Sequence, residues 1–228
     1  MLTAIIVAGG SSQRMGFDKL FAPLNGEPVL VHSLRAFEAT DLVHEIVLVG
    51  RADNLTELEA LVSARSFAKV AAIIPGGSRR QDSVRCGLEK VGAKADYIAV
   101  HDAARPLVRP ELIQRIYETA QRHGGAASGV PVVDTLKRAD KENVVISGVE
   151  REKLFTVETP QIFRRDLLER AFRAVLEAGV EVTDEISAVE MIGGKVVLVP
   201  NDERNFKITY PADLTLAEFI LRQRQGTS

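Results

Sequence analysis

Residues 5–19 read IIVAGGSSQRMGFDK, and the rest of the chain is organised around this stretch. Its first four residues are apolar, as expected for a strand that is buried on both faces of a parallel sheet. The strand leads into a loop with Gly9 and Gly10, followed by the cations Arg14 and Lys19. Because open α/β sheets bind ligands at the carboxyl ends of their strands, we expect this loop to bind an anionic ligand.

The loop matches neither of two familiar phosphate-binding patterns. A P-loop requires G-x-x-x-x-G-K-[ST], whereas the spacing here is G-x-x-x-x-x-G-x-x-K, and the dinucleotide pattern G-x-G-x-x-G is absent. What remains is a glycine-rich loop whose N–H groups can approach a phosphate closely, with two cations nearby. The alternative is a simple glycine turn followed by basic residues on the surface.

Composition limits the class of protein. The 228 residues, 46% of them hydrophobic, suit one large α/β domain. A net charge of −2 argues against a nucleic-acid-binding surface, and the absence of a run of about 18 apolar residues argues against a membrane span. Cys86 is the only cysteine, which excludes an intramolecular disulfide. The chain shows no leader pattern before its first strand, so we expect a cytoplasmic protein.

Apolar periodicity predicts alternating strands and helices. Strands are expected at 45–50, 70–75, 97–100, 126–133, 155–156, 195–199 and 205–209. Helices are expected at 28–39, 54–64, 111–122, 166–178 and 211–222, with a short helix capped by Thr183. This order predicts an α/β fold with a Rossmann-like, mostly parallel sheet and helices on both faces, in a single domain over residues 1–228.

Residues 134–152 interrupt the alternation. They are mostly polar and β-compatible, with Val144–Ile146 in the middle, and they lack the apolar face that a place in the main core requires. We expect a β-hairpin arm that projects from the domain. An isolated hairpin is poorly stable in water, so the arm should pack on a partner subunit.

Two further strand ends carry candidate site residues. After the strand at 70–75, Gly76 and Gly77 lead into an arginine-rich helix start, with Asp82 or Ser83 as the cap. The alternative is that these arginines form a solvated helix face. Asp102 follows the next strand and is placed to hold Mg²⁺ together with substrate phosphates, unless it caps the helix near Pro110.

The candidate residues indicate a type of chemistry. They include no Ser-His-Asp set, no Cys-His pair and no cluster of metal ligands, so a nucleophilic side chain is not indicated. Cations and one carboxylate suit phosphoryl or nucleotidyl transfer, which depends on positioning and charge neutralisation. An attacking phosphate monoester, with a second pKa of about 6, is already ionised at neutral pH and needs no general base.

Seven ordered motifs, covering almost the whole chain, resemble the 2-C-methyl-D-erythritol 4-phosphate cytidylyltransferase family. They lie at residues 8–19, 76–84, 101–106, 134–135, 159–161, 183–185 and 205–209. The resemblance implies a nucleotidyltransferase fold similar to the glycosyltransferase-A type. It implies transfer of CMP from CTP to 2-C-methyl-D-erythritol 4-phosphate in the non-mevalonate isoprenoid pathway. It also implies Mg²⁺ or another divalent cation, and a homodimer formed through the arm.

The same resemblance implies roles for individual residues. The catalytic cations would be Arg14, Lys19 and Lys207. The nucleotide would be bound by Ala8, Gly9, Gly10, Ser11, Gly77, Ser83, Asp102 and Ala103. The acceptor would be bound by Asp102, Arg105, Thr135, Arg151, Thr159 and Thr183, with Thr135 and Arg151 reaching across the dimer. Asp102 would place the metal. Ser78 stands where an Asp is common in the family, which bears on the base and ribose contacts.

Two other functions remain open from the sequence. Ribitol-5-phosphate cytidylyltransferase shares the fold, the first loop and a similar arm. The motifs at 101–106 and 134–138 look more like the methylerythritol family. A non-catalytic nucleotide-binding dimer is the alternative from another class. It would not need four charged residues directed at one phosphorus, namely Arg14, Lys19, Asp102 and Lys207.

Overall fold

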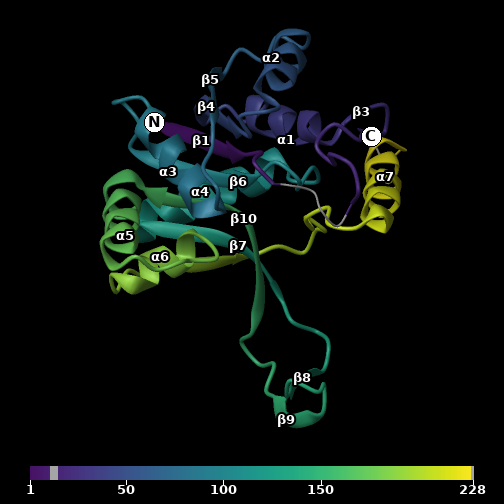
Figure 1. The fold of residues 1–228 in the computed structure, drawn as a ribbon, viewed down its shortest axis with the longest axis vertical. Coiled ribbons are helices and arrows are strands. Elements are labelled where there is room, and N and C mark those ends of the chain that lie inside the picture. Colours follow the sequence, from purple (N-terminus) through teal and green to yellow (C-terminus); the bar gives the residue numbers. More distant parts are fainter. Residues whose placement is uncertain (11–14, 227–228) are drawn as a thin grey trace.

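A seven-stranded sheet forms the centre of the computed structural model, which describes residues 1–10 and 15–226 (Figure 1). In spatial order its strands are β11 (Val197–Pro200), β7 (Gly125–Pro131), β10 (Phe155–Arg164), β6 (Tyr97–Asp102), β1 (Leu2–Val7), β4 (Val43–Gly50) and β5 (Val70–Pro75). Among these strands, β10 alone pairs antiparallel with its neighbours. The predicted α/β class with a mostly parallel sheet is confirmed.

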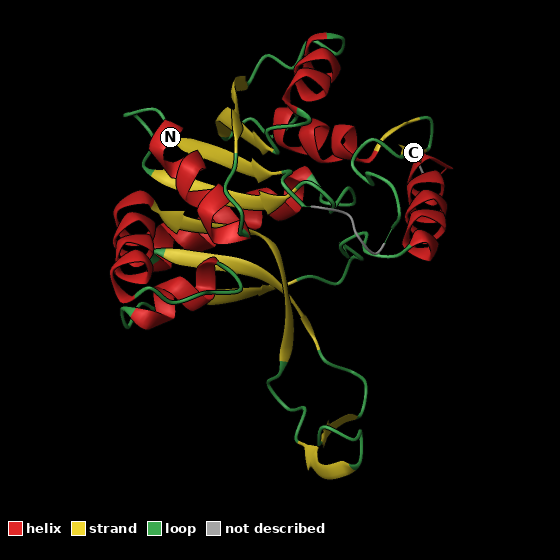
Figure 2. Cartoon of the chain, in the orientation of Figure 1, coloured by secondary structure: helices red, strands yellow, loops and turns green. Residues whose placement is uncertain are grey.

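Helices cover both faces of this sheet (Figure 2). One face packs against α1 (Val29–Glu38), α2 (Leu55–Ser63) and α4 (Pro110–His123). The other packs against α3 (Arg80–Lys90), α5 (Arg165–Ala178) and α6 (Glu185–Met191). In β1, Ala4 and Ile6 belong to the first core and Ile5 to the second. Burial on both faces explains why β1 is apolar without alternation.

A third, smaller core joins the two ends of the chain. It contains Leu24 of β2 (Pro23–Leu24), which pairs with β3 (Glu27–Pro28), and Ala217 of α7 (Pro211–Gly226). Ile208 lies in the same core, just before α7. Its burial anchors the segment that precedes α7.

The predicted arm is present as a hairpin. β8 (Leu136–Ala139) pairs antiparallel with β9 (Val145–Val149), and Figure 1 shows this ribbon extending away from the main sheet beyond β7 and β10. Val144 and Ile146 at its tip are 58% and 61% exposed. Among the described residues, no helix combines the length and apolar content that crossing a membrane requires.

Two of the local predictions were wrong. Residues 205–209 form no strand, because the segment makes isolated contacts, such as the hydrogen bond from Ile208 N to Ala104 O at 2.8 Å, and pairs with no strand edge. The cap of α6 is Asp184 and not Thr183, because the Asp184 carboxylate accepts a hydrogen bond from Ser187 N at 3.0 Å. A carboxylate at this position satisfies an N–H group that lacks a partner within the helix.

Several predicted boundaries shift as well. α3 begins at Arg80, so Ser83 lies inside the helix, while Asp82 accepts a hydrogen bond from Arg79 N at 3.2 Å in the first turn. The strand predicted at 155–156 extends to Arg164, because β10 pairs with β7 and then also with β6. α7 continues to Gly226, past the predicted end at 222.

The close contact between α3 and β1 provides a test of the packing. A Cβ built on Gly87 would lie 2.6 Å from Ile5 Cγ2. This methyl group cannot move away easily, because Ile5 is branched at Cβ and lies in a central strand. Overpacking costs about 1–3 kcal/mol and exceeds the gain in helix propensity of about 0.5–1 kcal/mol. We therefore expect Gly87→Ala to lower the free energy of unfolding by about 1–2 kcal/mol, measured by urea denaturation.

The control for this substitution is Glu89→Ala on the exposed face of α3, where we expect a change within about 0.5 kcal/mol. Ile5→Ala removes the clashing methyl group, so the loss caused by Gly87→Ala should shrink in the Ile5→Ala background. A gain in stability from Gly87→Ala alone would show that α3 can move away from β1 at little cost.

Candidate functional site

A cavity of about 240 Å³ opens where β1 and β6 end. The two strands are paired in register so that Val7 lies opposite Asp102, which places the loop after β1 beside this carboxylate. Eight of the predicted site residues line the cavity: Ala8, Gly9, Gly10, Lys19, Gly77, Ser83, Asp102 and Lys207. The position agrees with the rule that open α/β sheets bind ligands beyond the carboxyl ends of their strands.

The glycine turn before α3 is required by close packing. A Cβ on Gly76 would lie 2.4 Å from Ser83 Oγ, and a Cβ on Gly77 would lie 2.3 Å from Asp82 Cβ. The first turn of α3 therefore packs directly against the two glycines that precede the helix. As a result, the amino-terminal end of the helix, with Ser83, forms one wall of the cavity.

Asp102 is surrounded by three cations from different parts of the chain. Arg80 Nε donates a hydrogen bond to Oδ1 at 3.0 Å, and Lys207 Nζ lies 3.0 Å from Oδ2. Arg105 Nε lies 3.7 Å from Oδ2. Burial by itself raises the pKa of this carboxyl group, but the charges of Arg80, Lys207 and Arg105 outweigh it and hold the pKa well below its usual value. Asp102 is therefore ionised at neutral pH. It does not cap the helix near Pro110, because the capping position of that helix is Arg109 and no side chain accepts a hydrogen bond there.

Arg80 also binds a second carboxylate, Glu185 of α6. Its Nη1 and Nη2 atoms donate to Oε1 and Oε2 of Glu185 at 2.6 and 3.1 Å, and the Glu185 side chain is fully buried. Burial raises the pKa of Glu185, and the charge of Arg80 reduces this rise without cancelling it. Arg80 is a site residue that was not predicted from the sequence. The arginine run after the glycine turn was the available signal, but it did not show which arginine faces inward.

The other two arginines of that run are surface residues. Arg79 pairs with Asp82 at 2.9 Å, and Arg85 pairs with Glu89 at 2.8 Å. The alternative of a solvated helix face therefore holds for Arg79 and Arg85, although Arg79 also reaches the rim of the cavity.

Lys19 connects the first loop with the segment before α7. The side chain is 9% exposed, and Nζ donates a hydrogen bond to Ile208 O at 2.6 Å. Lys19 and Lys207 thus line the same cavity from opposite ends of the chain. The predicted residues Ser11 and Arg14 lie outside the described residues.

Three of the predicted residues lie behind the cavity wall. Thr159 Oγ1 accepts a hydrogen bond from Asp102 N at 3.0 Å and lies 3.1 Å from His101 Nδ1. Burial lowers the pKa of His101 to about 3, so this ring is uncharged at neutral pH. Ala103 is fully buried, with its N–H bonded to Val7 O. Arg105 Nη1 donates to the carbonyl of Asn205 at 2.9 Å.

The remaining predicted acceptor residues lie away from the cavity lining. Thr135 and Arg151 are exposed at the base of the arm, where Arg151 donates a hydrogen bond to Val133 O. Thr183 is exposed before α6, with its hydroxyl 3.3 Å from Ser187 Oγ. Within this one chain, the structure does not bring these three residues to Asp102.

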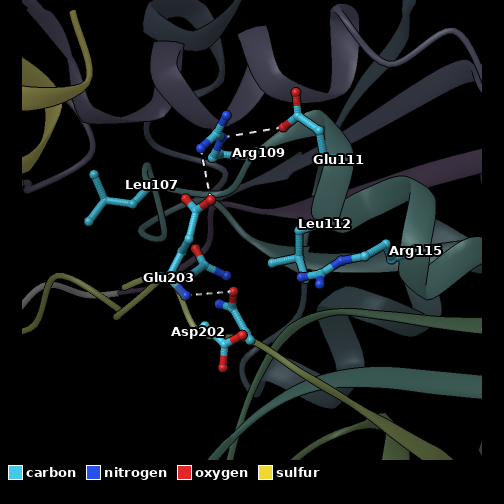
Figure 3. Close-up of a pocket in the computed structure, with 9 residues that line it drawn as sticks. Leu107, Arg109, Glu111, Leu112, Arg115, Asp202 and Glu203 are labelled. Atoms are coloured by element: carbon cyan, nitrogen blue, oxygen red, sulfur yellow. Dashed lines mark hydrogen bonds and ion pairs between the residues drawn. The ribbon is translucent and has the colours of Figure 1, made fainter. Parts of the chain in front are cut away.

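A second cavity, of about 280 Å³, is lined by residues from 107–115 and from the segment at 201–205 (Figure 3). Arg109 and Glu203 pair across it at 2.8 Å, and Arg109 also lies 3.3 Å from Glu111. None of the predicted site residues lines it. The charges that line it largely compensate one another, so the cavity at Asp102 is the candidate site.

Comparisons with known proteins agree with this geometry. The family model described as "IspD: 2-C-methyl-D-erythritol 4-phosphate cytidylyltransferase" matches residues 2–223. A protein of that name from Dehalococcoides mccartyi is 41% identical over 221 residues, which covers 96% of each chain.

Solved structures are similar over nearly the same length. A crystal structure of 4-diphosphocytidyl-2C-methyl-D-erythritol synthase is 34% identical, with a TM-score of 0.83 and coverage of 96% of this chain and 97% of that one. The 2-C-methyl-D-erythritol 4-phosphate cytidylyltransferase of Thermus thermophilus is 31% identical, with a TM-score of 0.79 and coverage of 96% and 98%. The chain belongs to the IspD family of 2-C-methyl-D-erythritol 4-phosphate cytidylyltransferases.

Proposed function

We propose that this protein transfers CMP from CTP to 2-C-methyl-D-erythritol 4-phosphate and releases pyrophosphate, as a step of isoprenoid biosynthesis in the cytoplasm. The observation that carries the proposal is the convergence of Lys19, Arg80, Asp102 and Lys207 on one cavity beside the loop at 8–10. Family membership over residues 2–223 supports the same activity.

Charge neutralisation is the main task of the site in this reaction. An oxygen of the acceptor phosphate attacks the α-phosphorus of CTP and forms the new P–O bond. The bond from the α-phosphorus to the oxygen that it shares with the β-phosphate breaks, and pyrophosphate leaves with the electron pair. We assign stabilisation of the charge on the phosphate oxygens to Lys19 and Lys207, together with Arg14. The acceptor phosphate is ionised before it attacks, so no general base is required.

The two glycine-rich segments are assigned to the nucleotide. Ala8, Gly9, Gly10 and Ser11 would bind the triphosphate through backbone N–H groups, because this loop follows the end of β1. The base would lie against Gly77 and Ser83, at the amino-terminal end of α3. Both backbone groups of Ala103 are hydrogen-bonded within the fold, to Val7 O and from Ser33 Oγ. We therefore assign Ala103 to support of the wall rather than to direct contact.

Asp102 is the group that fits a divalent cation. No cluster of three or more His, Cys, Asp or Glu side chains suitable for a metal occurs among the described residues. Mg²⁺ commonly needs only one or two carboxylates when substrate phosphates and water complete its coordination, so the single Asp102 carboxylate is sufficient. When bound, Mg²⁺ would neutralise charge on the phosphate oxygens. Lys207 would be free to contribute to the same task once its pairing with Asp102 is relaxed.

The acceptor site is assigned to two subunits. Thr135 and Arg151 lie apart from their own cavity, at the base of an arm with an exposed apolar tip. We propose that residues 1–228 form one nucleotidyltransferase domain, and that its arm at 134–152 brings these two side chains to the cavity of a partner in a homodimer. Arg105, Thr159 and Thr183 would contribute to the acceptor side from the domain itself.

The choice of acceptor is tested by pyrophosphate release. With CTP and Mg²⁺ present, we expect release with 2-C-methyl-D-erythritol 4-phosphate and much slower release with ribitol 5-phosphate. A preference for ribitol 5-phosphate would identify the protein as the other cytidylyltransferase. Binding of CTP without release from either acceptor would indicate a non-catalytic nucleotide-binding protein.

Lys207→Met tests the catalytic cations while retaining much of the apolar stem. Because the ammonium group would contact the charge that develops in the transition state, we expect kcat to fall at least about 10²-fold. The matched control is Lys90→Met at the exposed end of α3, which should keep wild-type turnover. Near-normal kcat for Lys207→Met would remove this residue from the mechanism.

Arg151→Ala tests the arm. We expect a higher KM for the acceptor with little change in CTP affinity, measured by kinetics and calorimetry, and no effect from Arg138→Ala within the hairpin. At an acceptor concentration far below the KM of Arg151→Ala, refolding an equal mixture of Arg151→Ala and Lys207→Met chains should restore about a quarter of wild-type activity, because half of the dimers are mixed and each mixed dimer regains one of its two sites. No recovery on mixing would show that the arm acts within its own subunit.

A further inference from the structure

We propose that Glu185 is a positioning residue that holds Asp102 in place through Arg80. The three side chains come from α6, β6 and α3, and they form one continuous series of hydrogen-bonded charges. The inference rests on the proposed function, because Asp102 lines the proposed nucleotide site.

The orientation of the Arg80 guanidinium group is fixed by two carboxylates, Glu185 and Asp102. Nη1 and Nη2 bind the two oxygens of Glu185 at 2.6 and 3.1 Å, and Nε donates to Asp102 Oδ1 at 3.0 Å. A bidentate contact between two planar groups fixes their relative orientation. Glu185 therefore determines the direction in which the Nε–H bond of Arg80 points toward Asp102.

Glu185 itself cannot contact a ligand in the cavity. Its side chain is fully buried and is not part of the cavity lining, whereas Arg80 and Asp102 both line it. Burying a carboxylate costs several kcal/mol before pairing, and an apolar side chain would often fill such a space at no loss of stability. A charged group at this position therefore suggests a role in the electrostatics of the site beyond helix packing.

The backbone around Glu185 is held in place on both sides. Gln161 of β10 donates from Nε2 to Asp184 Oδ2 at 3.1 Å and accepts from Ile186 N at Oε1, also at 3.1 Å. The carboxylate of Glu185 is thus presented to Arg80 by a segment that is fastened to the central sheet.

The charges explain why an uncharged partner would not serve equally well. Arg80 is shared between two carboxyl groups, and its two-pronged contact with Glu185 favours the ionised form of that group, although burial raises its pKa. With Glu185 ionised, the side chains of Glu185, Arg80 and Asp102 together carry one net negative charge. Without the charge on Glu185, Arg80 would neutralise Asp102 by itself. The remaining negative charge allows Asp102 to pair with Lys207 and Arg105, whose nitrogens lie 3.0 and 3.7 Å from Oδ2.

Glu185→Gln tests the inference because it keeps the size of the side chain and removes the charge. We expect kcat to fall about tenfold, a typical loss when a partner of a site residue is changed, with less than about a twofold change in the KM for CTP. The matched control is Glu27→Gln, which removes the charge from another carboxylate bound by two nitrogens of one arginine, Arg65, and which does not line the cavity. The control should keep the wild-type kcat even if its stability falls. An unchanged kcat in folded Glu185→Gln would show that the pair only joins α3 to α6 and would overturn the inference.

A second background tests whether the effect passes through Arg80. Arg80→Met should lower kcat by itself, and adding Glu185→Gln to it should cause no further loss. Losses that multiply would show that Glu185 acts independently of Arg80, contrary to the inference.

A spectroscopic measurement separates this inference from the proposed function. The Nε–H resonance of Arg80, assigned by ¹⁵N NMR, should be protected from exchange in the wild type and in Glu27→Gln, and should lose protection in Glu185→Gln. Retained protection overturns the inference whatever the activity. Failure of the wild type to release pyrophosphate with either acceptor overturns the proposed function alone.

Discussion

The Asp102 carboxylate imposes the main constraint on this molecule. Its side chain is 10% exposed at the end of a central strand, and a carboxylate withdrawn from water is tolerated only with good ionic and hydrogen-bonding partners. Those partners are Arg80 from α3, Arg105 from the turn after β6, and Lys207 from the segment before α7. Satisfying one buried charge therefore requires that distant parts of the chain meet at a single point.

The fold brings these parts together by separate means. Pairing of β1 with β6 places the loop after β1 beside Asp102. The tight turn at Gly76 and Gly77 places the start of α3 at the same cavity. Lys207 is held near Asp102 because the adjacent residue Ile208 is buried in the small third core. The hydrogen bond from Lys19 to the carbonyl of Ile208 then connects the two ends of the chain across the cavity. The cavity lining thus contains two cations, Arg80 and Lys207, that are paired with one carboxylate.

The arm at 134–152, unlike the central sheet and its helices, is not held by burial in a core of its own domain. Its hairpin extends from the body, and its exposed apolar tip has no core of its own chain to enter. The body concentrates the groups assigned to the nucleotide, whereas two groups assigned to the acceptor, Thr135 and Arg151, are presented outward. Such a division suits a reaction in which both substrates carry negative charge and must be held by separate sets of side chains.

Local chemistry in the sequence determined much of this protein. The apolar run before Gly9 identified a strand buried on both faces, and the polar stretch at 134–152 identified a hairpin outside the core, because periodicity and turn residues act over short distances. The pairing of Arg80 with Glu185 and the irregular path of residues 205–209 were decided only by the tertiary structure. Both depend on contacts between residues far apart in the chain. Helical and strand periodicity are local patterns, so they do not indicate which of several arginines faces a buried carboxylate.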